Sequence, residues 1–89
     1  MAENDELFEV LSAITDKDTM AKFLIEILTP REIKDLQLRW QLLKMIEDKI
    51  PQREIASQLG ISLCKITRGS RLLKDKQTVT FALLNKNKD

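Results

Sequence analysis

The residues richest in binding chemistry lie between Gln52 and Lys74, where basic and hydroxyl side chains alternate with apolar ones. Guanidinium and ammonium groups pair with phosphate oxygens, and arginine can also donate two hydrogen bonds to one guanine edge. Catalytic chemistry is disfavoured, because the chain has no histidine to act as a base and no cysteine and histidine cluster with metal-ligand spacing. These residues indicate binding of a polyanion, and we expect that the protein is not an enzyme.

The net charge of +1 hides an asymmetry along the chain. Residues 1–19 carry six acidic side chains and one lysine, whereas residues 55–89 carry seven basic side chains and two acidic ones. A chain polarised in this way can present a basic surface to a polyanion. On charge alone, an ordinary solvated face explains the pattern equally well.

The spacing of apolar residues predicts an all-α fold. Only two glycines and two prolines occur, and the segments between them carry apolar side chains at helical spacing. We expect helices near residues 7–14 and 20–28, a long helix from about 32 to 48, and a short one in QTVTFALLNKNKD with a frayed basic end. In LTP, Thr29 can cap the long helix and Pro30 can take its first position.

The long helix is apolar on two sides. One line holds Ile33, Leu36, Trp40 and Leu43, and the other holds Leu38, Leu42, Met45 and Ile46. A helix of this kind must be covered on both sides, yet a chain of 89 residues has few elements left to cover it. We therefore expect residues 1–89 to form a single domain that assembles as an intertwined homodimer, with a compact monomer as the alternative.

Residues 52–71, QREIASQLGISLCKITRGSR, match the helix-turn-helix pattern, which we place at about 52–72. Ala56 is small where the two helices must approach closely, Gly60 suits a turn with positive φ, and Ser62 can cap the second helix. The positions expected to be buried are Ile55, Leu59, Ile61 and Ile66. A plain helical hairpin is the alternative interpretation.

The helix-turn-helix predicts that the second helix enters the major groove of double-stranded DNA by its N-terminal end. Leu63 and Cys64 then suit thymine methyl groups, while Arg53 and Lys65 suit guanine or phosphate. Thr67 suits a base or the DNA backbone. Gln52, Arg71 and Lys74 suit phosphates, which position a protein without specifying sequence. The candidate DNA-binding residues are Gln52, Arg53, Ser62, Leu63, Cys64, Lys65, Thr67, Arg71 and Lys74.

A glycine within the second helix needs an explanation. In ITRGS, Gly69 lies inside the helix, where glycine costs about 1 kcal/mol relative to alanine. We expect Gly69 on the side turned toward the protein body, where a side chain would fill the space next to the long helix.

Three segments, LTPREIKDLQLRW, QREIASQLGIS and ITRGSRLLK, resemble the bacterial tryptophan repressor family over about residues 28–74. The resemblance implies an intertwined all-helical dimer that binds palindromic operators only with L-tryptophan bound as corepressor, and no other cofactor. It also implies a ligand site in which Arg39 and Arg68 flank the indole and Arg68 helps to hold the carboxylate. Thr29 and Gly69 line the same implied site.

Several residues depart from the family pattern. Leu72 stands where relatives have a serine, Glu26 where they have an apolar residue, and Pro51 where Ser or Thr caps a helix. These differences leave open a related DNA-binding regulator with no ligand or a different effector. An alternative from another class is a protein-interaction module that does not use DNA as a partner. This alternative predicts that the affinity for DNA depends little on salt concentration.

The location of the protein follows from features of the sequence. Its single cysteine, Cys64, allows no intramolecular disulfide, and the acidic N-terminus does not resemble a basic signal peptide. No apolar run approaches the roughly 20 residues that span a bilayer. We expect a cytoplasmic protein that does not contact a membrane.

Overall fold

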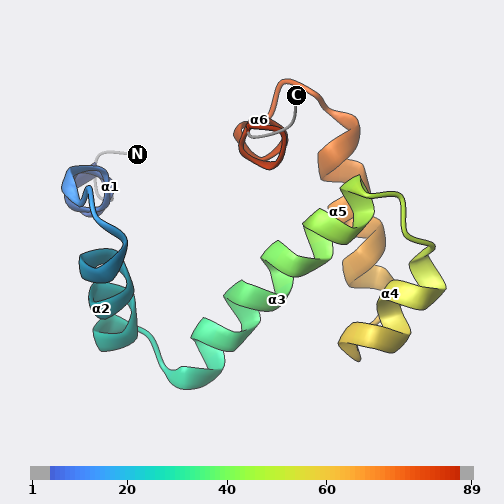
Figure 1. Cartoon of the computed structure of the whole chain (residues 1–89), viewed down its shortest axis with the longest axis horizontal. Helices are drawn as coiled ribbons and strands as arrows, with labels where there is room; N and C mark the ends of the chain where they lie inside the picture. Colours follow the sequence, from blue (N-terminus) through green and yellow to red (C-terminus); the bar gives the residue numbers. More distant parts are fainter. Residues whose placement is uncertain (1–4, 87–89) are drawn as a thin grey trace. The chain divides into compact units, whose positions relative to one another are not determined.

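The computed structural model describes residues 5–86, which form helices joined by short turns, without strands in this range (Figure 1). The helices are α1 (Asp5–Ala13), α2 (Lys17–Ile27), α3 (Pro30–Glu47), α4 (Gln52–Leu59), α5 (Leu63–Lys74) and α6 (Val79–Leu84). This confirms the predicted all-α fold. The expected frayed basic end falls partly on residues 87–89, which lie outside the described residues. The chain divides into two compact units, Met1–Asp35 and Leu36–Asp89.

The N-terminal unit is built from α1, α2 and the start of α3. The Asp16 carboxylate caps α2 by accepting a hydrogen bond of 2.8 Å from the Thr19 amide, and this bond lowers the pKa of Asp16 below its usual value. Neither α1 nor α2 contains a buried residue, and the large apolar side chains of Phe8 and Ile25 are exposed. The apolar stripes predicted in these helices are thus present but only partly covered within the single chain.

The start of α3 is fixed by a reciprocal pair of hydrogen bonds. The Glu32 amide donates to Thr29 Oγ1 at 3.1 Å, and the Thr29 amide donates to Glu32 Oε1 at 2.9 Å. This capping box satisfies two amides that the helix itself leaves without partners. Pro30 occupies the first helical position, as predicted.

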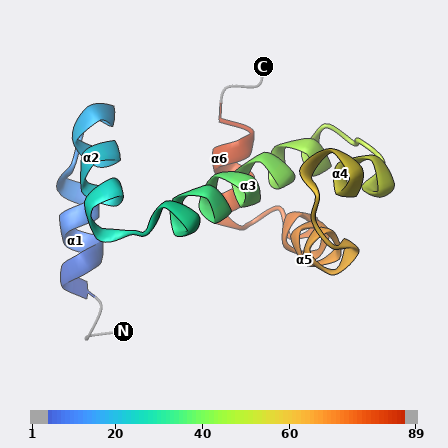
Figure 2. The ribbon, with the colours of Figure 1, turned by 90° about the horizontal axis from the view of Figure 1, so that it is seen from below.

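The C-terminal unit holds the hydrophobic core. Leu42 and Met45 of α3, Ile55 of α4 and Ile66 of α5 form one buried cluster, against which neighbouring apolar side chains pack. Figures 1 and 2 show α4 and α5 beside the carboxyl-terminal part of α3. The partly buried side chains packed against the cluster are Ile46, Ile50, Ala56, Leu59 and Ile61. Burial of these residues holds the angle between α4 and α5.

The turn between α3 and α4 contains a lysine in a left-handed conformation. Lys49 has a φ of 63°, its amide donates to the Ile46 carbonyl at 2.9 Å, and the Ile50 amide donates to the Met45 carbonyl at 3.1 Å. This pair of bonds is a Schellman motif, in which glycine is the usual residue at the left-handed position.

Replacing Lys49 with glycine is expected to raise the free energy of unfolding by about 1 kcal/mol, because glycine has no Cβ penalty in this conformation. Lys49→Ala is the matched control, since it removes the same side chain but keeps the penalty. Urea unfolding of both variants checks the prediction. Equal stability of the glycine and alanine variants would show that the turn stores no such strain.

Candidate functional site

The pair α4 and α5 has the geometry predicted for a helix-turn-helix. Gly60 ends α4 in the left-handed conformation with a φ of 64°, and its amide donates to the Ala56 carbonyl at 2.9 Å. Ile55 and Ile66 are fully buried between the helices and α3, which confirms these two as core positions. Leu59 and Ile61 are only partly buried, because they lie at the edge of the cluster.

The two helices start differently. The Ser62 hydroxyl caps α5 by accepting from the Lys65 amide at a long 3.4 Å, as expected from the sequence. Pro51 precedes α4 and provides no side-chain cap. The first turn of α4 is therefore stabilised by packing of Ile55 and not by a capping side chain.

The face of α5 that points away from the core is polar and cationic. Ile66, Gly69 and Leu73 are the buried residues of α5, and at 3.6 residues per turn Cys64 and Arg71 lie on the opposite side. The helix carries four basic side chains, Lys65, Arg68, Arg71 and Lys74, and no acidic one. Every candidate DNA-binding residue named from the sequence is exposed.

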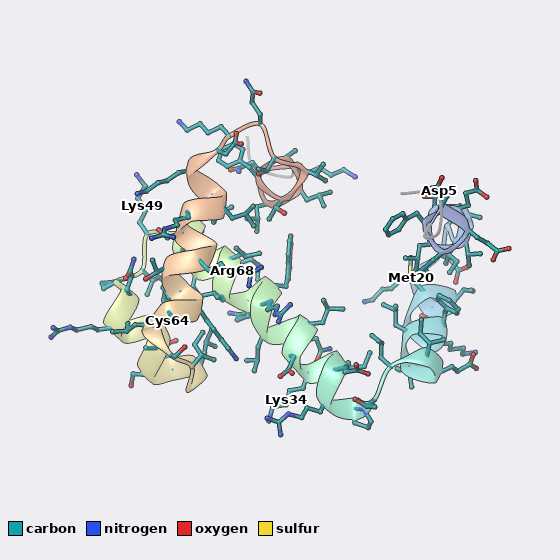
Figure 3. The ribbon with its side chains drawn as sticks, turned by 180° about the vertical axis from the view of Figure 1, so that it is seen from behind. Asp5, Met20, Lys34, Lys49, Cys64 and Arg68 are labelled. Carbon is teal, nitrogen blue, oxygen red and sulfur yellow. The ribbon has the colours of Figure 1, made fainter. Side chains whose placement is uncertain are left out.

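Figure 3 helps to locate this face, with Cys64 at the end of α5 nearest α4 and Arg68 in the middle of the helix. Within it, the Thr67 hydroxyl donates a hydrogen bond of 3.0 Å to the Leu63 carbonyl. The sequence interpretation missed this bond, although threonine within a helix often bonds to the carbonyl four residues earlier. The hydroxyl proton of Thr67 is thus already used inside the helix.

Gly69 marks the closest approach of α5 to α3. A Cβ atom added to Gly69 would lie 3.1 Å from Ile46 Cδ1 and 3.4 Å from Leu43 Cδ2. The glycine faces the protein body, as the sequence predicted, and any side chain there must displace aliphatic groups of α3.

The other candidate ligand residues lie at the surface. Arg39 on α3 and Arg68 on α5 belong to the C-terminal unit, and both are exposed. Thr29 belongs to the N-terminal unit, is exposed, and uses its hydroxyl oxygen as the cap of α3. Its capping function accounts for a threonine at this position independently of any ligand.

The described residues offer neither a metal centre nor a membrane-spanning helix. In residues 5–86, histidine, cysteine and acidic side chains form no group of three that could hold a metal ion. Over the same range, every helix is too short or too polar to cross a membrane.

Comparisons with known proteins agree with one another. The family model described as Trp repressor protein matches residues 2–88. Curated proteins named Trp operon repressor homolog are similar to the chain. The one from Xylella fastidiosa is 38% identical over 82 residues, which cover 86% of this chain and 89% of that protein. The one from Chlamydia trachomatis is 33% identical over 72 residues, covering 75% and 77%. No solved structure matches the chain.

Proposed function

Because this chain belongs to the Trp repressor protein family, a family of transcription regulators, we propose that it represses transcription by binding a palindromic operator as a homodimer with L-tryptophan bound. The observation that carries the proposal is the α4 and α5 pair. Ile55 and Ile66 are fully buried and hold the two helices together, while the cationic face of α5 remains exposed. A rigid helix with an exposed cationic face suits the major groove of DNA.

The DNA contacts that we propose follow from the exposure and chemistry of each side chain. Arg53, exposed in the first turn of α4, has the fork of donors that fits guanine or phosphate. Arg71 and Lys74 lie in the last turn of α5 and suit phosphates. The remaining members of the proposed DNA-binding set are Gln52, Ser62, Leu63, Cys64, Lys65 and Thr67.

The proposed corepressor site consists of Thr29, Arg39, Arg68 and Gly69, which match the family residues around L-tryptophan. A planar guanidinium can stack on the indole and can also pair with the ligand carboxylate, and lysine does not combine these properties. Two exposed arginines on α3 and α5 support this assignment, because neither is required for the core. No other cofactor is proposed.

A second copy of the chain is proposed to cover the apolar surface. The single chain leaves many large apolar side chains exposed, namely Leu7, Phe8, Val10, Ile25, Ile27, Leu36, Trp40, Val79 and Leu83. Large apolar side chains exposed in such number are typical of surfaces that bind another molecule. An intertwined homodimer accounts for these exposed side chains. In it, residues 1–89 of each chain are proposed to act as one DNA-binding domain in the cytoplasm.

Two residues favour a second candidate function, a related DNA-binding regulator with no ligand or another effector. Leu72, where relatives have a serine, is 39% exposed on α5. Glu26, where relatives have an apolar residue, is exposed on α2. Leu72 lacks the hydroxyl group of the serine in relatives, and Glu26 lacks their apolar side chain.

Calorimetry with L-tryptophan separates these candidates. We expect heat of binding for the folded dimer, and at least about tenfold weaker binding for Arg39→Ala and Arg68→Ala, because each loses a stacking and charged contact. Arg31→Ala, an exposed arginine of α3 outside the proposed site, is the matched control. Absence of heat at millimolar ligand would eliminate the corepressor proposal and leave the DNA-binding one standing.

A further inference from the structure

One acidic residue, Glu54, stands among five basic side chains between Gln52 and Lys74. It is exposed in the first turn of α4, directly after Arg53. None of the proposed DNA contacts uses a carboxylate, because phosphate oxygens carry negative charge and repel it. A carboxylate at this place on a cationic surface therefore needs an explanation.

The Glu54 carboxylate is hydrogen-bonded to an uncharged side chain. Gln58 Nε2 donates to Glu54 Oε1 at 3.3 Å, one turn further along α4. A hydrogen bond from a neutral amide orients the carboxylate but adds no positive charge to balance it. The negative charge of Glu54 is thus presented at the surface of α4 and is not neutralised by its hydrogen-bond partner.

Capping of α4 does not explain Glu54. A glutamate three residues after the N-cap residue commonly completes a capping box by accepting from the N-cap amide. Here the N-cap residue is Pro51, which has no amide hydrogen to donate. The local benefit left to Glu54 is the favourable interaction of an acidic side chain with the positive end of the helix dipole.

In a helix-turn-helix bound to DNA, the first helix crosses the DNA backbone. Gln52 and Arg53, which share the first turn of α4 with Glu54, belong to the proposed DNA-binding set. Successive residues are rotated by about 100°, so Glu54 flanks Arg53 while Ile55 faces the core. A phosphate that contacts this turn lies within about 10 Å of Glu54, the Debye length at about 0.1 M salt, so dissolved ions screen the repulsion only in part.

We propose that Glu54 lowers the affinity of this chain for DNA of any sequence by repelling phosphates, and thereby limits binding of DNA by the chain without L-tryptophan. The repulsion does not depend on sequence, because every duplex carries the same phosphates. The inference rests on the proposed function, since it assumes that α4 lies against the DNA backbone. It deepens that function by naming a residue that restrains the ligand-free state.

The test replaces Glu54 with glutamine, which removes the charge and keeps a side chain that can bond to Gln58. The probe is a mixed-sequence DNA duplex. At about 50 mM salt we expect Glu54→Gln to bind it about five- to tenfold more tightly than the unchanged chain, with and without L-tryptophan, because a dimer loses two repulsive charges. The gain is expected to fall as salt is raised to about 200 mM, because screening shortens the range of the repulsion.

Two further variants separate this repulsion from effects within a helix. Asp18→Asn removes an exposed acidic side chain from the first turn of α2, so it reproduces the loss of charge near a helix N-terminus outside α4 and α5. Gln58→Ala breaks the hydrogen bond to Glu54 and leaves the charge in place. Neither variant is expected to raise the affinity for DNA. Urea unfolding checks that each variant remains folded.

Unchanged or weaker binding by folded Glu54→Gln would overturn the inference and assign Glu54 to the helix dipole, while DNA binding stands. An equal gain in Asp18→Asn would also overturn it, because net charge and not the position of Glu54 would then be responsible. Failure of the unchanged chain to bind the duplex at low salt, with or without L-tryptophan, would instead contradict the proposed function, and the inference would fall with it.

Discussion

Raising the salt concentration from about 50 to 200 mM is expected to weaken binding of the L-tryptophan-saturated chain to operator DNA by about 10³ to 10⁵-fold. Each chain exposes Arg53, Lys65, Arg71 and Lys74 on α4 and α5. A homodimer doubles this number, which lies within the range of about 6–10 phosphate contacts that gives such a dependence. The effect arises because neutralised phosphates release their condensed counterions.

The slope of log affinity against log salt shows which residues contact phosphates. Arg71→Gln is expected to make the slope of log affinity against log salt shallower by about 2, since a dimer loses two phosphate contacts. Lys34→Gln, an exposed lysine of the N-terminal unit outside the proposed DNA-binding set, should leave the slope unchanged. Weak DNA binding with a flat salt dependence would instead identify a helical protein-interaction module.

Replacing Gly69 with valine is expected to lower the free energy of unfolding by about 1–3 kcal/mol, the usual cost of overpacking a core. A Cβ atom added at Gly69 would lie 3.1 Å from Ile46 Cδ1 and 3.4 Å from Leu43 Cδ2. The two methyl groups of valine extend beyond this Cβ atom, so α5 must move away from α3. Ser57→Val, at an exposed position of α4, measures the cost of valine in a helix without overpacking. Urea unfolding compares the two variants, and equal losses would contradict close packing at Gly69.

Because Gly69 packs closely against α3, its role in packing must be separated from its proposed role in ligand binding. If Gly69 lines the ligand site, as the family resemblance implies, a larger residue there is expected to weaken ligand binding before it weakens folding. The structure adds that a large residue also lowers stability, because a side chain at Gly69 would press directly on α3. Gly69→Ala is the informative variant, since the methyl end of Ile46 can shift by a few tenths of an ångström. Weaker L-tryptophan binding with unchanged stability would assign the glycine to the ligand site, and unchanged binding would assign it to packing.

The helix-turn-helix could be predicted from the sequence because its requirements are local. Gly60 supplies the left-handed turn, Ser62 the cap, and Ile55 and Ile66 the buried contact, each at a fixed spacing. The cap at Thr29 was predictable for the same reason, because Thr, Pro and Glu occur together at the start of an apolar period. In these places local propensity and the tertiary structure agree.

Other features could not be predicted, because they depend on competition between local preferences and the rest of the chain. Lys49 adopts a conformation that favours glycine, since the path from α3 to α4 requires it and no local signal indicates it. The apolar stripe with Leu7 and Phe8 suggested burial, yet a single chain leaves both side chains exposed. Periodicity shows that a face is apolar but not which molecule covers it.

The central claim is that L-tryptophan controls binding to DNA, and the affinity of the full chain for one operator duplex, measured with and without saturating L-tryptophan at one salt concentration, tests it directly. We expect the ligand to raise affinity by about 5 to 150-fold, the range of a coupling free energy of about 1–3 kcal/mol. Equal affinity in both conditions would contradict the claim and identify a regulator that binds DNA without this effector.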